Sequence, residues 1–200
     1  MERRASTDGP AEAAGPADEA LLRLFAKGDP QAARDLTGRL GPRAFSVALR
    51  VLGNRAEAED VAQEAMLRLW RMAPEWEPGR ARVSTWLYRV TLNLCLDRKR
   101  RAQAVDLDTV PEPPDEAPPA IEVLQQAARV DALQAALMHL PDRQRQAVVL
   151  RHIEELSNPE IAEIMGIGVE AVESLTARGK RALAGQLAGQ RAALGYDDDG

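Results

Sequence analysis

The feature that most constrains this chain is a stretch near its C-terminus, residues 154–183, which reads EELSNPEIAEIMGIGVEAVESLTARGKRAL. Apolar residues recur at helical spacing on both sides of Gly166, a residue that suits the left-handed end of a helix. Ser157 can cap the first helix, Glu160 can complete a capping box with it, and Pro159 fits the first turn. The pattern therefore predicts two short helices joined by a tight turn.

The second of these helices carries Arg178, Lys180 and Arg181. A helix, a turn of about three residues and a second helix with cations is typical of a DNA-reading helix-turn-helix. An ordinary helical hairpin in a bundle would give the same apolar pattern. The rest of the chain has to decide between the two.

Composition favours an all-α fold. Aromatic residues make up only 4% of the 200 residues, and no stretch alternates at period two. The length suffices for one medium domain or two small ones. No apolar run is long enough to span a membrane, and residues 1–20 lack an apolar signal core. We therefore expect a cytoplasmic protein without membrane insertion.

Nothing in the sequence indicates catalysis or a cofactor. Cys95 is the single cysteine, and His139 and His152 lie far apart, so neither a disulfide nor a metal site is expected. The sequence offers no nucleophile–base pair and no glycine-rich phosphate loop. We expect no cofactor, no metal and no enzymatic activity, with Cys95 as a small core residue.

The net charge of -5 is unevenly distributed along the chain. Residues 21–104 hold sixteen basic and nine acidic residues, whereas residues 123–196 hold eight of each. A phosphate-binding surface is therefore expected in the first half. Between the two halves, residues 105–122 contain five prolines and six acidic residues, which is typical of an extended linker.

These patterns predict two small helical domains joined by a flexible linker. The predicted segments are a disordered arm (1–17), a first domain (18–104), the linker (105–122), a second domain (123–187) and a frayed tail (188–200). The helices expected before the helix-turn-helix start at 18 or 19, 30, about 56, 84, about 123 and, after the cap at Asp142, 143. Ser84 and Asp142 should cap two of them, and Pro42 should kink or divide the second.

Two surfaces of the first domain are candidates for binding. The polar face of the third helix is either a solvated surface with ion pairs such as Glu64–Arg68 or an acidic docking surface. In the loop after it, Trp76 lies close to arginines, and single-stranded bases stack on such side chains. Trp76 could equally fold back on the core.

The fourth helix ends in a run of four cations, residues 98–101. Cations at a helix C-terminus suit the helix dipole. Four in a row exceed what the dipole needs, so the run favours a phosphate contact.

Together these segments resemble a known family. AEDVAQEAMLRLW and STWLYRVTLNLCLDRKRR resemble the second conserved region of bacterial sigma factors, and LPDRQRQAVVLRHIEELSNPEIAEIMGIGVEAVESLTARGKRAL resembles their fourth region. The linker stands where larger sigma factors have another domain, as in the extracytoplasmic-function (ECF) group. The resemblance covers residues 18–103 and 123–187. It implies a protein that binds core RNA polymerase, directs promoter recognition and opening, and is held inactive by an anti-sigma factor.

The resemblance also implies roles for individual residues. Those matching the polymerase-docking motif are Asp60, Gln63, Glu64, Arg68 and Trp70. Those that would open promoter DNA and capture a flipped minus-ten base are Trp76, Arg80, Arg82, Arg89, Asn93, Arg98, Lys99, Arg100 and Arg101. Those that would face minus-thirty-five bases are Val169, Glu170, Glu173, Ser174, Thr176 and Ala177, with Arg178, Lys180 and Arg181 on the DNA backbone.

The recognition helix departs from the family's commonest pattern. Glu173 stands where a basic residue is usual, and Leu175 stands where an arginine is usual. Glu173 could accept a hydrogen bond from cytosine N4, but it also repels phosphates. Because the second domain is neutral overall, we expect it to bind DNA weakly unless polymerase holds both domains on the promoter.

Two alternative functions remain open from the sequence. One is a helix-turn-helix transcription regulator whose first half is a sensor or dimerisation domain. The other is a sigma mimic that sequesters a regulator. A sensor domain would not need the cations of residues 98–101 or the loop around Trp76, so the first half argues against the former.

Overall fold

The computed structural model describes residues 14–79, 81–105 and 121–188, and all regular structure in these ranges is helical. The all-α prediction is confirmed. The helices are α1 (Ala14–Ala26), α2 (Pro30–Leu52), α3 (Arg55–Met72), the 3-10 turn η1 (Ala73–Glu75), α4 (Val83–Val105), α5 (Ile121–Met138), α6 (Asp142–His152), α7 (Asn158–Met165) and α8 (Val169–Ala188). Most of the predicted linker, arm and tail lies outside the described residues, as does Arg80, while Val105, Ile121 and Glu122 of the predicted linker are helical. No described helix has the length and hydropathy of a membrane span.

Local caps set several helix ends. The Asp29 carboxylate accepts a hydrogen bond from the Gln31 N–H at 2.8 Å, and the Asn54 side chain accepts one from the Glu57 N–H at 3.0 Å. Gly53 ends α2 with φ of 74°, a left-handed conformation that glycine adopts without strain. These caps fix where α2 begins, where it ends and where α3 begins.

Three predicted helix starts differ from the structure, and of the kink or division expected at Pro42 the division does not occur. Pro42 lies inside α2 without dividing it, because side chains on both sides of it, such as Leu40 and Ala44, are buried in the core. α4 starts at Val83 and α6 at Asp142, so Ser84 and Asp142 lie in first turns rather than at caps. α1 starts at Ala14, so residues 14–17 are helical.

The helix-turn-helix forms as predicted. The Glu160 carboxylate accepts hydrogen bonds from the Ser157 N–H at 2.9 Å and the Ser157 hydroxyl at 2.6 Å. Gly166 ends α7 with φ of 64°. α8 then packs closely on α6, because a Cβ atom on Gly179 would lie 2.5 Å from Val148 Cγ2. A side chain at position 179 would force the two helices apart.

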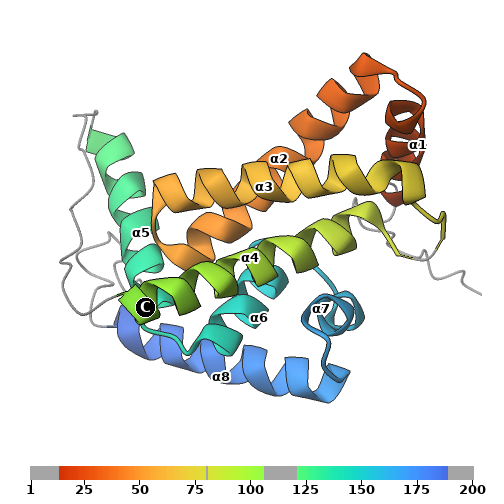
Figure 1. The fold of residues 1–200 in the computed structure, drawn as a ribbon. Coiled ribbons are helices and arrows are strands. Elements are labelled where there is room, and N and C mark those ends of the chain that lie inside the picture. The colour runs from red at the N-terminus through yellow and green to blue at the C-terminus, as the bar shows by residue number, and fades with distance from the viewer. Residues whose placement is uncertain (1–13, 80, 106–120, 189–200) are drawn as a thin grey trace, which may run out of the picture.

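The two halves of the chain pack against each other. α4 lies between α3 on one side and α7 on the other, while α6 and α5 contact α2 (Figure 1). The buried cluster is continuous across both halves: it includes Val47, Leu69 and Leu87 of the first and Leu150 and Ile164 of the second. The arrangement brings the helix-turn-helix next to the cation-bearing helix α4.

Candidate nucleic-acid interface

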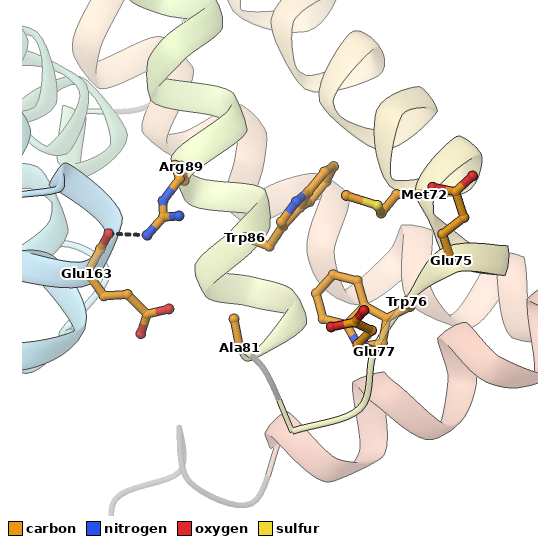
Figure 2. A pocket seen from close by; sticks show the side chains of 8 residues that line it. All are labelled: Met72, Glu75, Trp76, Glu77, Ala81, Trp86, Arg89 and Glu163. Carbon is orange, nitrogen blue, oxygen red and sulfur yellow. Dashed lines mark hydrogen bonds between the residues drawn. The ribbon is translucent and has the colours of Figure 1, made fainter.

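The predicted cations of α4 are held by different partners. Arg98 Nη2 lies 3.2 Å from Asp60 Oδ2, and Arg100 lies 3.8 Å from Asp97. Arg89 Nη2 donates a hydrogen bond to the backbone carbonyl of Glu163 in α7 (Figure 2). Arg101 and Asn93 are exposed. The row therefore lies along one helix, but several of its charges already have acceptors.

Lys99 and Arg82 reach across to the other half of the chain. Lys99 Nζ binds the Asp142 carboxylate, and Arg82 Nη1 donates to Glu160 Oε1 at 2.7 Å. The partnership with Lys99 also explains why Asp142 does not act as a cap. Its carboxylate is engaged by that ammonium and by Arg145 at 3.3 Å.

Trp76 folds back toward the core, as the second interpretation of the loop expected. Its ring packs edge-to-face on Trp86, with ring centroids 6.3 Å apart and planes at 83°. The indole Nε1 is enclosed and has no hydrogen-bond partner among the described residues. Both rings nevertheless line a hollow of about 320 Å³, together with Met72, Arg89 and Glu163 (Figure 2).

This hollow has the chemistry that a base-binding site needs. Aromatic rings offer stacking surfaces, and the Arg89 guanidinium and neighbouring carboxylates offer donors and acceptors. The carboxylates are Glu75, Glu77 and Glu163. Trp86 was not among the predicted site residues. Its apolar neighbours and its position three residues after Val83, the first residue of α4, place it beside the loop.

The predicted docking residues of α3 separate into two groups. Glu64 and Arg68 form an ion pair at 2.8 Å, and this hydrogen bond with Arg68 lowers the pKa of Glu64. Gln63 is exposed on the same helix. Trp70 instead packs on Phe25 with ring centroids 4.4 Å apart, and Asp60 turns toward Arg98. Of this set, Asp60, Gln63 and Arg68 are exposed, whereas Glu64 and Trp70 are partly buried.

Leu67 is a surface residue that sequence reasoning missed. It is 47% exposed and lines an apolar hollow of about 340 Å³ between α2 and α3, together with Gln63 and Met66. Its position off the buried stripe of α3 was the available signal, because a leucine there is not needed for the core.

The predicted recognition residues lie along one exposed side of α8. Glu170, Ser174, Ala177 and Lys180 are exposed, and Val169 is 40% exposed. Other members of the set have local partners. Glu173 accepts from Asn158 Nδ2 at 3.4 Å, Arg178 and Arg181 donate to carbonyls of their own helix, and the hydroxyl oxygen of half-buried Thr176 is enclosed.

Arg145 is a second residue that sequence reasoning missed. It is 3% exposed, and its guanidinium donates to the carbonyls of Leu137, Met138 and Leu140 at 2.7–2.8 Å. A fourth hydrogen bond, to Val51 O at 2.8 Å, crosses to the first half. Burial lowers the pKa of Arg145. The sequence signal is its spacing four residues before the buried Val149, on the same helix face.

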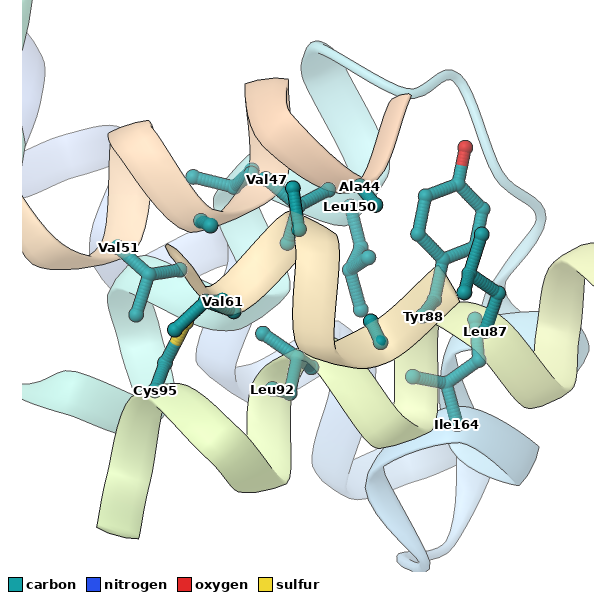
Figure 3. Close-up of a cluster of buried hydrophobic side chains, with 14 of the residues drawn as sticks. Ala44, Val47, Val51, Val61, Leu87, Tyr88, Leu92, Cys95, Leu150 and Ile164 are labelled. Atoms are coloured by element: carbon teal, nitrogen blue, oxygen red, sulfur yellow. The ribbon is translucent and has the colours of Figure 1, made fainter. Parts of the chain in front are cut away.

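Apolar packing and a buried tyrosine also join the two halves of the chain. Tyr88, 2% exposed, donates to Glu154 Oε2 at 2.6 Å. Burial and the Glu154 carboxylate raise the pKa of Tyr88. Figure 3 shows Tyr88 and Leu87 in the same cluster as Leu150 and Ile164.

Two helical units, one with a cation-bearing helix and one with a helix-turn-helix, have the organisation of a two-part DNA-binding protein. Two family models match this organisation: Sigma-70 region 2 over residues 36–105 and Sigma-70 region 4 over residues 131–183. They match the two halves that carry the candidate surfaces.

Curated relatives agree with the family models. The chain is 33% identical to the ECF RNA polymerase sigma factor SigW of Bacillus subtilis, over 83% of this chain and 94% of SigW. It is 37% identical to SigE of Mycolicibacterium smegmatis over 77% of this chain, and spans 61% of the length of SigE. The chain therefore belongs to the family of ECF RNA polymerase sigma factors, the class of protein that directs transcription initiation.

Solved structures are similar in fold. CnrH in complex with the cytosolic domain of CnrY is 28% identical, with a TM-score of 0.64 over 86% of this chain and 98% of CnrH. The sigma factor RpoE of Bartonella quintana, in complex with the anti-sigma factor NepR, is 20% identical with a TM-score of 0.62 over 78% and 96% of the two chains. The latter likeness concerns the fold alone.

Proposed function

We propose that the two halves of this sigma factor divide the work of promoter recognition. Residues 18–104 bind core RNA polymerase and the minus-ten element, and residues 123–187 read the minus-thirty-five element. The observation that carries this proposal is the presence, in this order, of a region 2 with a cation-bearing helix and a region 4 with a helix-turn-helix.

The polymerase-docking surface that we propose is the exposed face of α3. Gln63, Glu64 and Arg68 supply its polar groups, and Leu67 supplies an exposed apolar side chain at its centre. A polar rim around an apolar contact is the usual anatomy of a protein interface. Asp60, which is also exposed, binds Arg98 of α4, and half-buried Trp70 packs on Phe25 of α1.

The minus-ten element is proposed to bind along α4 and the loop before it. The hollow beside Trp76 and Trp86 receives a flipped base, since aromatic walls offset the cost of unstacking it. The cations of α4 bind the phosphates on either side, with Arg100 and Arg101 the most accessible of them.

The minus-thirty-five element is proposed to take α8 into its major groove. The exposed Glu170, Glu173 and Ser174 face base edges, and Lys180 and Arg181 face the DNA backbone. Because Glu173 repels phosphates, this helix contributes sequence selection more than affinity.

Localisation, partners and chemistry follow from this role. We propose a cytoplasmic protein without enzymatic activity of its own, since sigma factors as a class are not enzymes. We also propose an anti-sigma factor as a partner. Support comes from two proteins of similar fold: the sigma factor RpoE of Bartonella quintana, which forms a complex with the anti-sigma factor NepR, and CnrH, which forms one with the cytosolic domain of CnrY.

Reconstitution tests the proposed function. The full chain is added to core RNA polymerase and transcription is measured on a library of genomic promoter fragments. Specific start sites are expected only when both components are present. Absence of transcripts with a competent core would favour the alternatives, a sigma mimic or a regulator of another kind.

A matched pair of variants tests the α4 surface. Arg100→Ala with Arg101→Ala is expected to reduce open-complex formation about tenfold, because two phosphate contacts are lost. Arg34→Ala, an exposed arginine on α2, is the control and should leave open-complex formation unchanged.

A further inference from the structure

One exposed charge on α8 is not explained by the packing of the described residues. Glu173 is exposed, and within those residues its carboxylate has one polar partner, the Asn158 side chain of α7. Glu170 differs, because it lies in the first turn of α8, where the helix dipole favours an acidic side chain. Glu173 lies beyond that turn, so neither an ion pair nor the dipole accounts for its charge.

The contact with Asn158 sets the direction of this carboxylate. Asn158 Nδ2 donates to Glu173 Oε1 at 3.4 Å, between α7 and the part of α8 that lies beside it (Figure 1). The place of the amide is itself fixed, because Asn158 is the first residue of α7 and follows the capping box of Ser157 with Glu160. A long hydrogen bond from a neutral amide orients the carboxylate without removing its charge. The second oxygen, Oε2, is left for a partner outside the chain.

A carboxylate held in this way distinguishes the four bases by what each presents in the major groove. It accepts hydrogen bonds and donates none. Guanine presents the acceptors N7 and O6 there, and thymine presents O4, so both repel it. Adenine presents the N6 donor beside the N7 acceptor, whereas cytosine presents the N4 donor without an acceptor next to it. Cytosine is therefore the base that suits a single free carboxylate oxygen.

We propose that Glu173 selects a cytosine in the minus-thirty-five element and that Asn158 is its positioning residue. Oε2 of Glu173 accepts a hydrogen bond from cytosine N4 while Oε1 stays with the Asn158 amide. The inference rests on the proposed function, since it takes α8 to lie in the major groove. The guanine paired with this cytosine presents acceptors only, so a C·G pair is distinguished from a G·C pair.

The charge of Glu173 makes this contact selective. Phosphates along the groove repel the carboxylate whatever the sequence, and only a base with a suitable donor offsets that repulsion. A site without the cytosine therefore meets repulsion that nothing compensates, which is how an interface rejects a wrong partner. Arg178 does not relieve it, because its Nε donates to Ser174 O at 3.2 Å within α8.

The test uses the full chain with core polymerase on a promoter library. The library is built on a promoter that this holoenzyme uses, with the minus-thirty-five element randomised and a transcribed barcode in each fragment. Sequencing the barcodes in the RNA gives the preference for each base at each position. At one position, the unchanged chain should use cytosine about tenfold more than any other base.

Glu173→Gln identifies the residue that reads this position. The preferred base there should change from cytosine to adenine, because a glutamine amide matches the N6 donor and N7 acceptor of adenine. Preferences at the other positions should stay as they are. The matched control is Glu155→Gln, which removes the same charge from an exposed residue in the loop before α7. It should keep the cytosine preference.

Asn158→Asp tests the positioning role. The substitution keeps the size of the side chain but replaces the amide donor by a second carboxylate, which repels that of Glu173. The preference for cytosine should fall by about threefold, as expected for the loss of one hydrogen bond. An acidic residue in the first turn suits the dipole of α7, so thermal unfolding should show no loss of stability. A purely structural role for Asn158 would not move the base preference.

Three results would overturn the inference. One is a library profile in which no position prefers cytosine. Another is an unchanged profile for Glu173→Gln, whether or not all sequences are transcribed more strongly, since the charge would then only repel phosphates. An unchanged profile for Asn158→Asp would remove the positioning role. Failure of the proposed function has a different signature, because the unchanged chain would then initiate transcription at no promoter.

Discussion

At the scale of single residues, Arg145 links the two halves more directly than any surface ion pair. Its guanidinium, 3% exposed, satisfies four backbone carbonyls, one of them in α2. A planar group with five donors suits such a cluster, whereas the three donors of a lysine ammonium cannot reach all four carbonyls from one point.

Replacing Arg145 should therefore destabilise the whole chain. Arg145→Ala is expected to reduce the free energy of unfolding by about 3 kcal/mol, because buried carbonyls lose charged hydrogen bonds. Arg145→Lys should lose about half as much. Urea unfolding measures both, with the exposed Arg143→Ala as the control, expected within about 0.5 kcal/mol of the unchanged chain. A loss below about 1 kcal/mol for Arg145→Ala would show that water replaces the guanidinium.

At the scale of elements, the contact of α8 with α6 depends on one glycine. Gly179→Ala should destabilise the chain by about 1–3 kcal/mol, since its Cβ would meet Val148 Cγ2 at 2.5 Å and Gln144 O at 3.3 Å. Gly185→Ala in the same helix meets nothing within 4 Å and should stabilise it by about 0.5–1 kcal/mol through helix propensity. Thermal unfolding measures the stability of both variants. If both substitutions changed the free energy of unfolding in the same direction, close packing at Gly179 would be contradicted.

The proposed docking face of α3 gives a second element-scale prediction. Leu67→Asp should weaken binding to core polymerase about tenfold, because an apolar anchor at the centre of an interface contributes strongly. Leu24→Asp on α1 is the matched control, since Leu24 is 45% exposed and Leu67 is 47% exposed. Equal losses of polymerase binding in both variants would place the docking surface elsewhere. Circular dichroism of each variant would exclude unfolding as the cause.

Sequence reasoning succeeded where local interactions decide the structure. The Ser157 and Glu160 side chains and Gly166 fix the ends of α7 within a few residues, so the helix-turn-helix could be predicted. It failed where a distant partner competes for the same group. Asp142 binds Lys99, 43 positions away in the sequence.

The same limit applies to the candidate site. The cation row of α4 is visible in the sequence because its members are consecutive, and Arg100 and Arg101 are exposed as a DNA-binding role requires. The pairing of Arg82 with Glu160, 78 positions apart, has no local signal. Such contacts depend on how the two halves dock, which neither helical periodicity nor capping specifies.

At the scale of the whole molecule, the distribution of charge and the contacts between the two halves lead to the same expectation. Residues 123–196 hold eight basic and eight acidic residues, so region 4 has no net attraction for DNA. The excess cations lie in the first half, where three of them are bound by α6 and α7. In the intact chain, region 4 therefore has no net positive charge, and part of the cationic surface of the first half is already bound.

The chain should therefore depend on core polymerase for promoter binding. Without polymerase, we expect its affinity for duplex DNA with both promoter elements to be at least about a hundredfold lower, because polymerase makes the second contact intramolecular. Fluorescence anisotropy at physiological salt measures this with the chain alone, the core alone and both together. Repeating the measurement with a core polymerase of reduced DNA affinity would separate the contribution of the chain to promoter binding from that of the core. Tight, sequence-specific binding by the chain alone would contradict the charge argument, since that argument requires the polymerase to present both DNA-binding surfaces to the promoter.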